Sequence, residues 1–287
     1  MPKLALPNKG RLYDEVRAAL SDAGLDVRLT SDRVLFASLG EGFTALFVRA
    51  RDIPEFVADG VADAGITGWD CALESARELE TLLDLGFGRC RLSVALRAKP
   101  DGQPTTLDSV TDGARVATSF PRLAEQFFIE RGCQIQLVPI SGAAEVAPHL
   151  GIADAIVDLV STGSTLRTNG LVEVATILES TARLICRPRP MLDPEIASAL
   201  DDLALALGSV VRGRQHRYVM ANVPRARLAD VRDVLPGLNG PTVIDVPGSD
   251  FAAVHAVVPE RAVYRTTARL KALGCEGILV TRIERLL

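Results

Sequence analysis

Short apolar runs alternate with amphipathic stretches through about the first 210 residues. Residues 3–7 predict a strand, and the next stretch predicts a helix because its apolar residues recur at helical spacing. These residues are Leu12, Val16, Ala19, Leu20 and Ala23. Further strands are predicted at 44–50, 62–67, 92–97, 114–118, 135–140, 155–160 and 172–177, with helices after Asp52 and at about 121–131 and 142–150. This alternation predicts an α/β fold with a largely parallel sheet.

Two lobes are expected in this region. The stretch 89–179 carries strands and helices of its own, and the apolar run at 181–186 would lead the chain back to the first set. We therefore expect lobe I at 1–88 and 180–212, with lobe II inserted at 89–179.

The pattern changes after about residue 212. Strands predicted at 217–223, 242–246, 251–258 and 277–283 are interrupted by predicted helices at 225–235 and 260–273. The order β-α-β-β-α-β is that of a ferredoxin-like domain. We expect a separate C-terminal domain at 213–287, which serves either regulation or only assembly.

Composition narrows the function classes. Hydrophobic residues make up 48% of the 287 residues, which excludes intrinsic disorder because enough apolar surface is available to offset chain entropy. The net charge of −4 argues against broad nucleic-acid binding but leaves room for a local basic pocket that holds a small polyanion. No run of about 18 uncharged apolar residues predicts a membrane span. The N-terminal residues lack the layout of a signal peptide, so the expected location is cytoplasmic.

Cysteine and histidine positions point away from a structural metal site. The five Cys are scattered and form no C-x-x-C pair, and the three His lack metal-ligand spacing. We expect free, mostly buried thiols.

The most informative segment is a small polar loop between the strand at 155–160 and a helical pattern. Its residues are Ser161, Thr162, Gly163, Ser164 and Thr165. Backbone N–H groups at a helix start, with four hydroxyls beside them, form an anion site suited to a phosphate monoester. Gly163 would let the backbone approach the phosphate closely. The alternative is ordinary helix N-capping; a Walker A loop is excluded because its G-x-x-x-x-G-K-[ST] pattern is absent.

Two carboxylates, Asp154 and Asp158, precede this loop. At a strand period of two, both side chains are expected on one face and directed toward the ligand of the loop. Carboxylates are good acceptors for sugar hydroxyls, and they also bind Mg²⁺. The residue types therefore predict a phosphorylated sugar, with its phosphate on the loop and its hydroxyls on the carboxylates.

The stretch 145–166 has a recognisable pattern, E-x5-G-I-A-x2-I-V-D-L-V-S-T-G-S-T-L. It resembles the signature of the ATP phosphoribosyltransferase family, which opens histidine biosynthesis. Other segments resemble the same family: LALPNKGRL (4–12), VRARDIP (48–54), DAGITGWD (63–70), LGFGRCRLSVA (85–95) and PGLNGPTV (236–243). The resemblance covers essentially the whole chain, and the C-terminal domain makes it similar to the long, self-regulated form.

This resemblance implies a two-lobed catalytic region similar to the type II periplasmic-binding-protein fold. It also implies transfer of the 5-phosphoribosyl group from phosphoribosyl pyrophosphate to N1 of ATP, with release of pyrophosphate. Mg²⁺ is the implied cofactor, held mainly by the substrate phosphates. The loop 161–165 would bind the 5-phosphate, while Asp154 and Asp158, the implied catalytic residues, would bind the ribose hydroxyls.

The implied ATP contacts lie at strand ends and in turns: Lys9, Gly10, Arg11, Arg49, Asp70 and Arg89. The alternative for each cation is an ordinary solvated position. Asp70 would either accept a hydrogen bond from the adenine amino group or cap the helix that follows.

The resemblance further implies that the C-terminal domain binds histidine as a feedback inhibitor between subunits, with Leu238 and Thr242 in the matching turn. Inhibition by AMP and a homo-oligomer that shifts between dimer and hexamer are implied as well; no nucleic-acid or membrane partner is expected. Two other interpretations compete. One is a ligand-binding module of two α/β lobes, and the other is a catalytically inactive relative; the intact loop argues against both.

Overall fold

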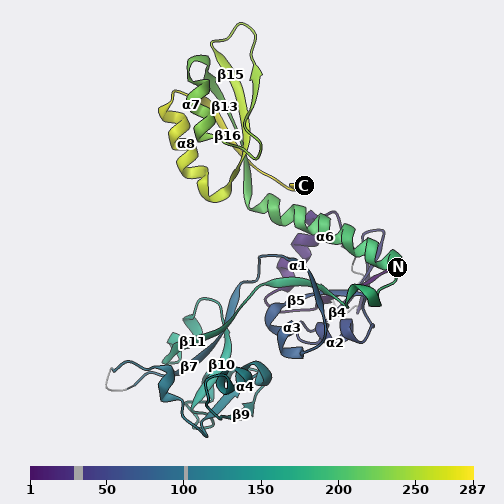
Figure 1. The fold of residues 1–287 in the computed structure, drawn as a ribbon, viewed down its shortest axis with the longest axis vertical. Helices are drawn as coiled ribbons and strands as arrows, with labels where there is room; N and C mark the ends of the chain where they lie inside the picture. The colour runs from purple at the N-terminus through teal and green to yellow at the C-terminus, as the bar shows by residue number, and fades with distance from the viewer. Residues whose placement is uncertain (29–34, 100–102) are drawn as a thin grey trace. The chain divides into compact units, whose positions relative to one another are not determined.

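The computed structural model describes residues 1–28, 35–99 and 103–287 (Figure 1). The described chain divides into two compact units, Met1–Arg17 with Asp26–Asp201, and Ala18–Leu25 with Asp202–Leu287. The division falls inside the long helix α6 (Pro194–Arg214), upstream of the boundary expected after residue 212. The first unit holds two sheets and the second unit holds one.

The first sheet has seven strands in the order β2-β3-β4-β1-β5-β12-β6. These are β1 (Lys3–Pro7), β2 (Val27–Arg28), β3 (Phe36–Leu39), β4 (Phe43–Val48), β5 (Ala64–Gly68), β6 (Glu80–Asp84) and β12 (Ala182–Cys186). The helices of this part of the chain are α1 (Tyr13–Asp22), α2 (Ile53–Ala58) and α3 (Trp69–Ser75). The predicted apolar face is confirmed, because Val16, Ala19 and Leu20 of α1 and the flanking Leu12 and Ala23 are all buried.

The second sheet has five strands in the order β11-β7-β10-β8-β9. These are β7 (Cys90–Arg97), β8 (Arg115–Thr118), β9 (Gln136–Pro139), β10 (Ala155–Val160) and β11 (Leu171–Ser180). Helix α4 (Pro121–Ile129) packs Phe127 and Phe128 into the core of this lobe, and α5 (Ser164–Thr168) follows β10. Two connections join the sheets: residues 85–89 lead from β6 to β7, and Thr181 alone separates β11 from β12.

Two predictions about these lobes are wrong. Neither sheet is largely parallel: β1 pairs in parallel with β4 and β5, and β8 with β9 and β10, whereas the other pairs are antiparallel. The antiparallel pairs arise partly because β7 and β11 carry the chain into and out of the second sheet. The helix expected at 142–150 is only a 3₁₀ turn at Ala144–Val146, and Pro148 prevents a regular helix from continuing through this stretch.

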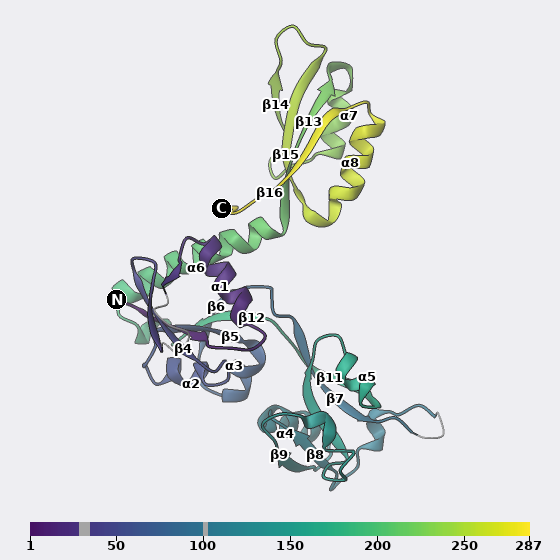
Figure 2. The same ribbon diagram turned by 180° about the vertical axis from the view of Figure 1, so that it is seen from behind.

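The C-terminal sheet has the order β14-β15-β13-β16, and all its pairs are antiparallel. Its strands are β13 (His216–Pro224), β14 (Thr242–Asp245), β15 (Phe251–Pro259) and β16 (Glu276–Arg282). Helices α7 (Leu228–Val234) and α8 (Val263–Ala272) cover one face of this sheet (Figure 2). Alternate residues Val219, Ala221 and Val223 are buried in the core of this domain. The predicted β-α-β-β-α-β order is confirmed.

Within the described ranges, no helix combines the length and the apolar character that a membrane span requires.

Candidate functional site

The polar loop at 161–165, called the phosphate loop below, follows the central strand of the second sheet. β10 is apolar and fully buried at Ala155, Ile156 and Val157, because it lies between β7 and β8 and packs on both faces. It runs parallel to β8, which runs parallel to β9. The carboxyl ends of these three strands therefore meet at one edge of the sheet, where open α/β sheets bind their ligands.

The third residue of the loop has a backbone conformation that only glycine adopts readily. Gly163 has φ of +73°, and a Cβ placed there would lie 3.2 Å from the guanidinium of Arg167. The Thr162 and Ser164 hydroxyls lie 2.9 Å apart and share a hydrogen bond. The first N–H groups of α5 lack intrahelical acceptors, as at any helix start. The loop thus presents N–H groups and hydroxyls together, as an anion site requires.

A hollow of about 290 Å³, the loop pocket, opens onto these residues. Asp158 and Glu145 bring two carboxylates to its wall. Burial raises the pKa of Asp158, the hydrogen bond from the Leu159 N–H (2.8 Å) opposes this shift, and the nearby charge of Glu145 adds to it. The sequence pattern began at Glu145 without assigning it a role; the 3₁₀ turn after β9 places it at the same sheet edge as the loop.

The structure places the two predicted carboxylates differently, because Asp158 lines the loop pocket and Asp154 does not. Asp154 precedes β10, at the opposite end of the strand from the loop, and a six-residue strand spans about 20 Å. Its carboxylate accepts hydrogen bonds from the Arg115 backbone N–H (2.8 Å) and from the guanidinium of the same residue (2.9 Å). These bonds lower the pKa of Asp154. Asp154 and Asp158 share one face of the strand, but four residues of strand separate them by about 13 Å.

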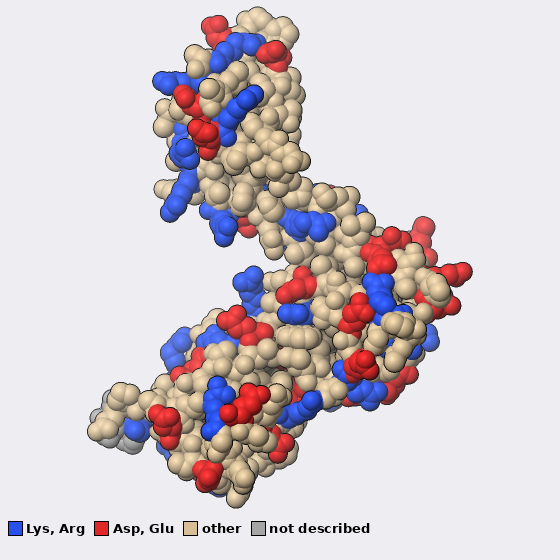
Figure 3. Space-filling model, viewed as in Figure 1, with Lys and Arg blue, Asp and Glu red and all other residues tan. Residues whose placement is uncertain are grey.

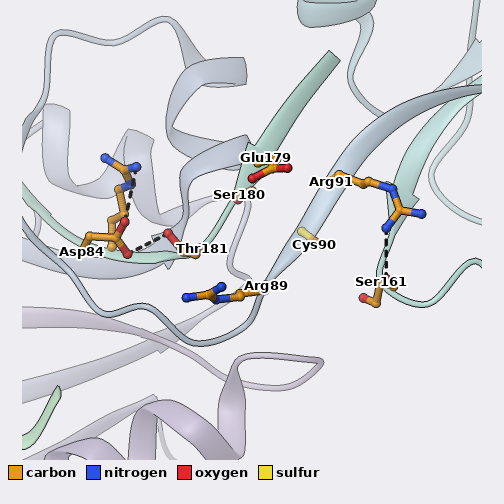
Figure 4. A pocket seen from close by; sticks show the side chains of 9 residues that line it. Asp84, Arg89, Cys90, Arg91, Ser161, Glu179, Ser180 and Thr181 are labelled. Atoms are coloured by element: carbon orange, nitrogen blue, oxygen red, sulfur yellow. Dashed lines mark hydrogen bonds and ion pairs between the residues drawn. The ribbon is translucent and has the colours of Figure 1, made fainter. Parts of the chain in front are cut away.

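A second hollow, of about 490 Å³, lies where the two connections join the sheets (Figure 4). Its lining residues are Asp84, Arg89, Cys90, Arg91, Ser161, Glu179, Ser180, Thr181 and Arg183. This junction pocket shares Ser161 with the loop pocket, so the two hollows are neighbours. In Figure 4, Arg89 extends toward Thr181 and Asp84, which are hydrogen-bonded to each other at 2.7 Å. Its Nε donates to the Gly86 carbonyl at 3.1 Å.

Arg91 fastens the phosphate loop to the second sheet. Its guanidinium makes a two-pronged ion pair with Glu173 and donates to the Ser161 carbonyl at 3.2 Å. Ser93 donates a further hydrogen bond to Glu173 at 2.8 Å. The guanidinium and the serine lower the pKa of Glu173. Arg91 was not predicted as a site residue, although it stands at the start of β7, two residues after Arg89 in the preceding connection.

Asp70 is a buried anchor at the junction. Its side chain is 1% exposed and accepts a hydrogen bond from the Ser180 hydroxyl, while its backbone N–H donates to the same oxygen at 3.0 Å. Arg11 lies 3.8 Å from the Asp70 carboxylate and donates to the Gly88 carbonyl. The helix cap expected as one alternative is not formed, because the carboxylate is turned to Ser180 and Arg11 and α3 has no side-chain cap. Asp70 instead positions Arg11 and ties α3 to the end of β11.

The remaining predicted contacts are not among the lining residues of these two pockets. Lys9, Gly10 and Arg49 are exposed just beyond the carboxyl ends of the parallel strands β1 and β4, and Gly10 has φ of +87°. Leu238 and Thr242 belong to the C-terminal domain, and both are exposed. Thr242 opens β14 opposite His255, whose ring bonds to the Tyr218 hydroxyl.

A carboxylate links the two lobes beside the site. Glu74 of α3 accepts hydrogen bonds from the backbone N–H groups of Arg122 (2.9 Å) and Leu123 (3.0 Å) at the start of α4. Helix α4 has no side-chain cap of its own, so Glu74 acts as its cap and complements the helix dipole. Arg51 adds a second link by donating to the Ser119 carbonyl at 2.9 Å.

Comparison with known proteins decides the family. Residues 49–207 match the family model described as ATP phosphoribosyltransferase. This chain belongs to the ATP phosphoribosyltransferase family. Residues 213–285 match a second model, described as "HisG, C-terminal domain". The family consists of transferases that catalyse the first step of histidine biosynthesis, so the resemblance seen in the sequence is confirmed.

Named relatives match over the full length. The ATP phosphoribosyltransferase of Gemmatimonas aurantiaca is 57% identical over 100% of both chains, and that of Halobacterium salinarum is 47% identical over 99% of both. A solved chain from the ATP phosphoribosyl transferase (HisG:HisZ) complex of Thermotoga maritima is 28% identical, with a TM-score of 0.61. The match covers 72% of this chain and 99% of the Thermotoga chain. The mixed α/β fold of this ATP phosphoribosyltransferase family member is thereby confirmed.

The described residues fit a magnesium ion only in part. Among them, no group of three or more His, Cys, Asp or Glu side chains is arranged to hold a metal ion. Asp158 and Glu145 offer two carboxylates on the wall of the loop pocket. That donor set suits Mg²⁺, which proteins bind through one or two carboxylates and which takes its other ligands from water and substrate phosphates.

The Glu74 link generates a prediction about local opening. Glu74→Ala removes the only side-chain acceptor shown for the Arg122 and Leu123 amides, and losing an N-cap costs about 1 kcal/mol. Hydrogen exchange of these two amides is expected to become about fivefold faster. Glu78→Ala is the matched control, because Glu78 is exposed and has no interaction among the residues described. Equal exchange in both variants would contradict the link.

Proposed function

We propose that the chain transfers the 5-phosphoribosyl group of phosphoribosyl pyrophosphate to N1 of ATP, giving N1-(5-phosphoribosyl)-ATP and pyrophosphate. The observation that carries this proposal is the pair of neighbouring pockets that share Ser161. One combines phosphate-binding groups with carboxylates, and the other is lined by several arginines. A phosphorylated sugar and a nucleotide need these two environments side by side. The site residues and the regulation that follow are part of this proposal.

In the proposed complex, the phosphate loop holds the 5-phosphate through the N–H groups and hydroxyls of residues 161–165. Asp158 accepts hydrogen bonds from the ribose hydroxyls, and Glu145 is the second carboxylate acceptor, in place of Asp154. The loop pocket supports this assignment, since both carboxylates line it together with the loop. Arg91 is a positioning residue that acts through the Ser161 carbonyl.

Chemically, the reaction needs no covalent nucleophile. The bond from ribose C1 to pyrophosphate breaks, and a bond from C1 to N1 of the purine forms on the opposite face. Catalysis then depends on positioning the two substrates and on stabilising the leaving pyrophosphate. Arg89, Lys9 and Arg49 supply positive charge for the anionic substrates, while Arg11 is held in place by Asp70.

Magnesium would supply a positive charge that neutralises the substrate phosphates and the departing pyrophosphate. Asp158 and Glu145 are the residues that would hold it from the protein side, with the remaining ligands from substrate and water. The two carboxylates themselves would accept hydrogen bonds from the ribose hydroxyls and keep the sugar oriented toward the junction pocket.

For regulation, we propose that the C-terminal domain binds histidine as a feedback inhibitor near Leu238 and Thr242, in a homo-oligomer of two or six chains. The match of residues 213–285 to a family model of their own supports a distinct role for this domain. The exposed Thr242 hydroxyl is available to the polar groups of an amino acid. AMP would compete with ATP in the junction pocket, and the enzyme would work in the cytoplasm.

A direct assay tests this proposal. The protein is mixed with ATP, phosphoribosyl pyrophosphate and Mg²⁺, with pyrophosphatase to pull the equilibrium, and the adduct is identified by mass spectrometry. We expect the adduct to form, and we expect added histidine to suppress its formation. If histidine does not reduce adduct formation, the transferase activity stands and the proposed regulation by histidine is refuted. Absence of adduct from folded protein would contradict the function.

The two aspartates provide a matched pair of variants. Asp158→Asn removes an acceptor that orients the ribose, and we expect kcat/KM to fall by at least roughly 10²-fold. Asp154→Asn weakens exposed contacts with Arg115, an ion pair and a hydrogen bond from its backbone N–H, which lie outside the loop pocket, so activity should stay within about twofold. Steady-state kinetics and thermal melting of both variants check this. A severe loss in Asp154→Asn with normal Asp158→Asn would reverse the assignment.

The raised pKa of Asp158 gives a pH prediction. Asp158 must be ionised to accept hydrogen bonds from the ribose hydroxyls, so activity falls as the pH drops through its pKa. Glu145→Gln removes a negative charge that raises this pKa, so the acid limb of the kcat/KM profile should move to lower pH. Glu125→Gln, on the exposed side of α4, is the control and should leave the limb in place. An unmoved or upward-shifted limb in Glu145→Gln would show that the two carboxylates do not interact.

A further inference from the structure

Three arginines follow one another at four-residue spacing beside helix α8. Arg265 and Arg269 lie one turn apart on the helix, and Arg261 precedes it in the 3₁₀ turn at Glu260–Ala262. Residues four apart project from the same side of a helix. We call these three side chains the arginine row. Basic side chains gather along the flank of the C-terminal domain that carries α8 (Figure 3).

The arginine row lines a hollow of about 660 Å³. Its other walls are apolar or weakly polar: Val234, Pro236, Val258, Pro259, Ala262 and the buried Thr266. Asp233 is the one acidic residue that lines it. The hollow is therefore amphipathic, with a charged side and an apolar side. Leu238 and Thr242, the residues of the proposed histidine site, are not among its lining residues.

The charges of the row are not neutralised within the domain. None of the three guanidinium groups has an ion-pair or hydrogen-bond partner in the part of the chain that the structure describes. The neighbouring acids are engaged elsewhere, because Glu260 pairs with Arg217 and Asp230 pairs with Arg227 at 3.0 Å. With Asp233 counted, the hollow keeps a net charge of +2. Like charges one turn apart repel, and a bound anion would relieve that repulsion.

From this arrangement we infer that the hollow is a second ligand site, which takes a nucleotide with two or more phosphates. Helical rise separates successive arginines by about 6 Å, so the row can contact adjacent phosphate groups of one chain. Guanidinium groups bind phosphate oxygens through paired N–H donors. The apolar walls at Val258 and Pro259 would face the nucleoside. Inorganic pyrophosphate alone would use the charged side and leave the apolar side empty.

The inference goes beyond the proposed catalysis, and its test counts binding sites. ATP binding to the full-length protein is measured by isothermal titration calorimetry without phosphoribosyl pyrophosphate. The wild type is compared with Arg265→Gln/Arg269→Gln. The double variant should lose one equivalent of bound ATP per chain, or bind that equivalent at least roughly 100-fold more weakly, because two charge-assisted contacts are removed.

Arg232→Gln/Lys271→Gln is the matched control. It removes the same charge from α7 and α8, but neither residue lines the hollow. It should bind as many equivalents as the wild type. Equal loss in both double variants would mean that net charge alone attracts ATP, and no loss in either would mean that the hollow binds no nucleotide; both results overturn the inference. A failure of the proposed catalytic function would not be confused with this outcome. The test compares the number of bound ATP equivalents between variants that differ only in the C-terminal domain, and it does not depend on turnover.

Two further probes test the ligand class. Adenosine should bind the second site far more weakly than ATP, and pyrophosphate should compete with ATP there but bind less tightly. Tighter binding of pyrophosphate than of ATP would overturn the assignment to a nucleotide. Capture of a poly-glutamate peptide in preference to ATP, again lost only in Arg265→Gln/Arg269→Gln, would overturn it in favour of an acidic protein segment.

Discussion

The antiparallel pairing of β7 with β10 is the constraint on which the candidate site depends. It places Arg91 opposite Val160, the last residue before the phosphate loop. On the other side of β7, the register with β11 sets Cys90 opposite Ser180, which holds Asp70. A slip of one residue would turn Arg91 to the other face of the sheet and release the Ser161 carbonyl. The register thus fixes both neighbouring pockets at once.

Buried polar contacts at the junction strengthen this constraint. Asp70 is almost fully buried, and a buried carboxylate is costly unless it is hydrogen-bonded and paired. Ser180 and Arg11 meet that requirement from two different segments. The close approach leaves no room for a Cβ at Gly68, where it would lie 2.3 Å from the Asp70 carboxylate. The same few residues therefore constrain the fold at the point where the lobes connect, beside the proposed junction pocket.

How far the sequence predicts this structure depends on the distance over which each contact acts. Local signals predicted the strand β10, the polar loop after it and the special backbone of Gly163, because all three follow from neighbouring residues. The pairing of Asp154 with Arg115 could not be predicted, because it depends on β8 lying next to β10. Glu145 is the first residue of the signature, but its place on the wall of the loop pocket depends on the 3₁₀ turn after β9 and could not be predicted from the local pattern. The Glu74 link joins two helices 48 residues apart and leaves no trace in local pattern.

The mixed strand directions have a similar origin. Alternating strands and helices indicate an α/β fold, yet they say nothing about where the chain crosses between sheets. β12 follows β11 after a single residue and pairs antiparallel with β5. That crossing, more than any single strand, determines where the junction pocket forms. The C-terminal domain was simpler to predict because its whole chain stays in one sheet, and the order β-α-β-β-α-β is itself typical of a ferredoxin-like domain, although its sheet order β14-β15-β13-β16 is not sequential.

The most direct measurement for this account is a crystal structure of the protein with phosphoribosyl pyrophosphate and Mg²⁺ bound. The account predicts the 5-phosphate on the backbone N–H groups of the phosphate loop, the ribose hydroxyls on Asp158, and the pyrophosphate directed toward the junction pocket. A 5-phosphate bound elsewhere, with Asp158 free of the sugar, would contradict it.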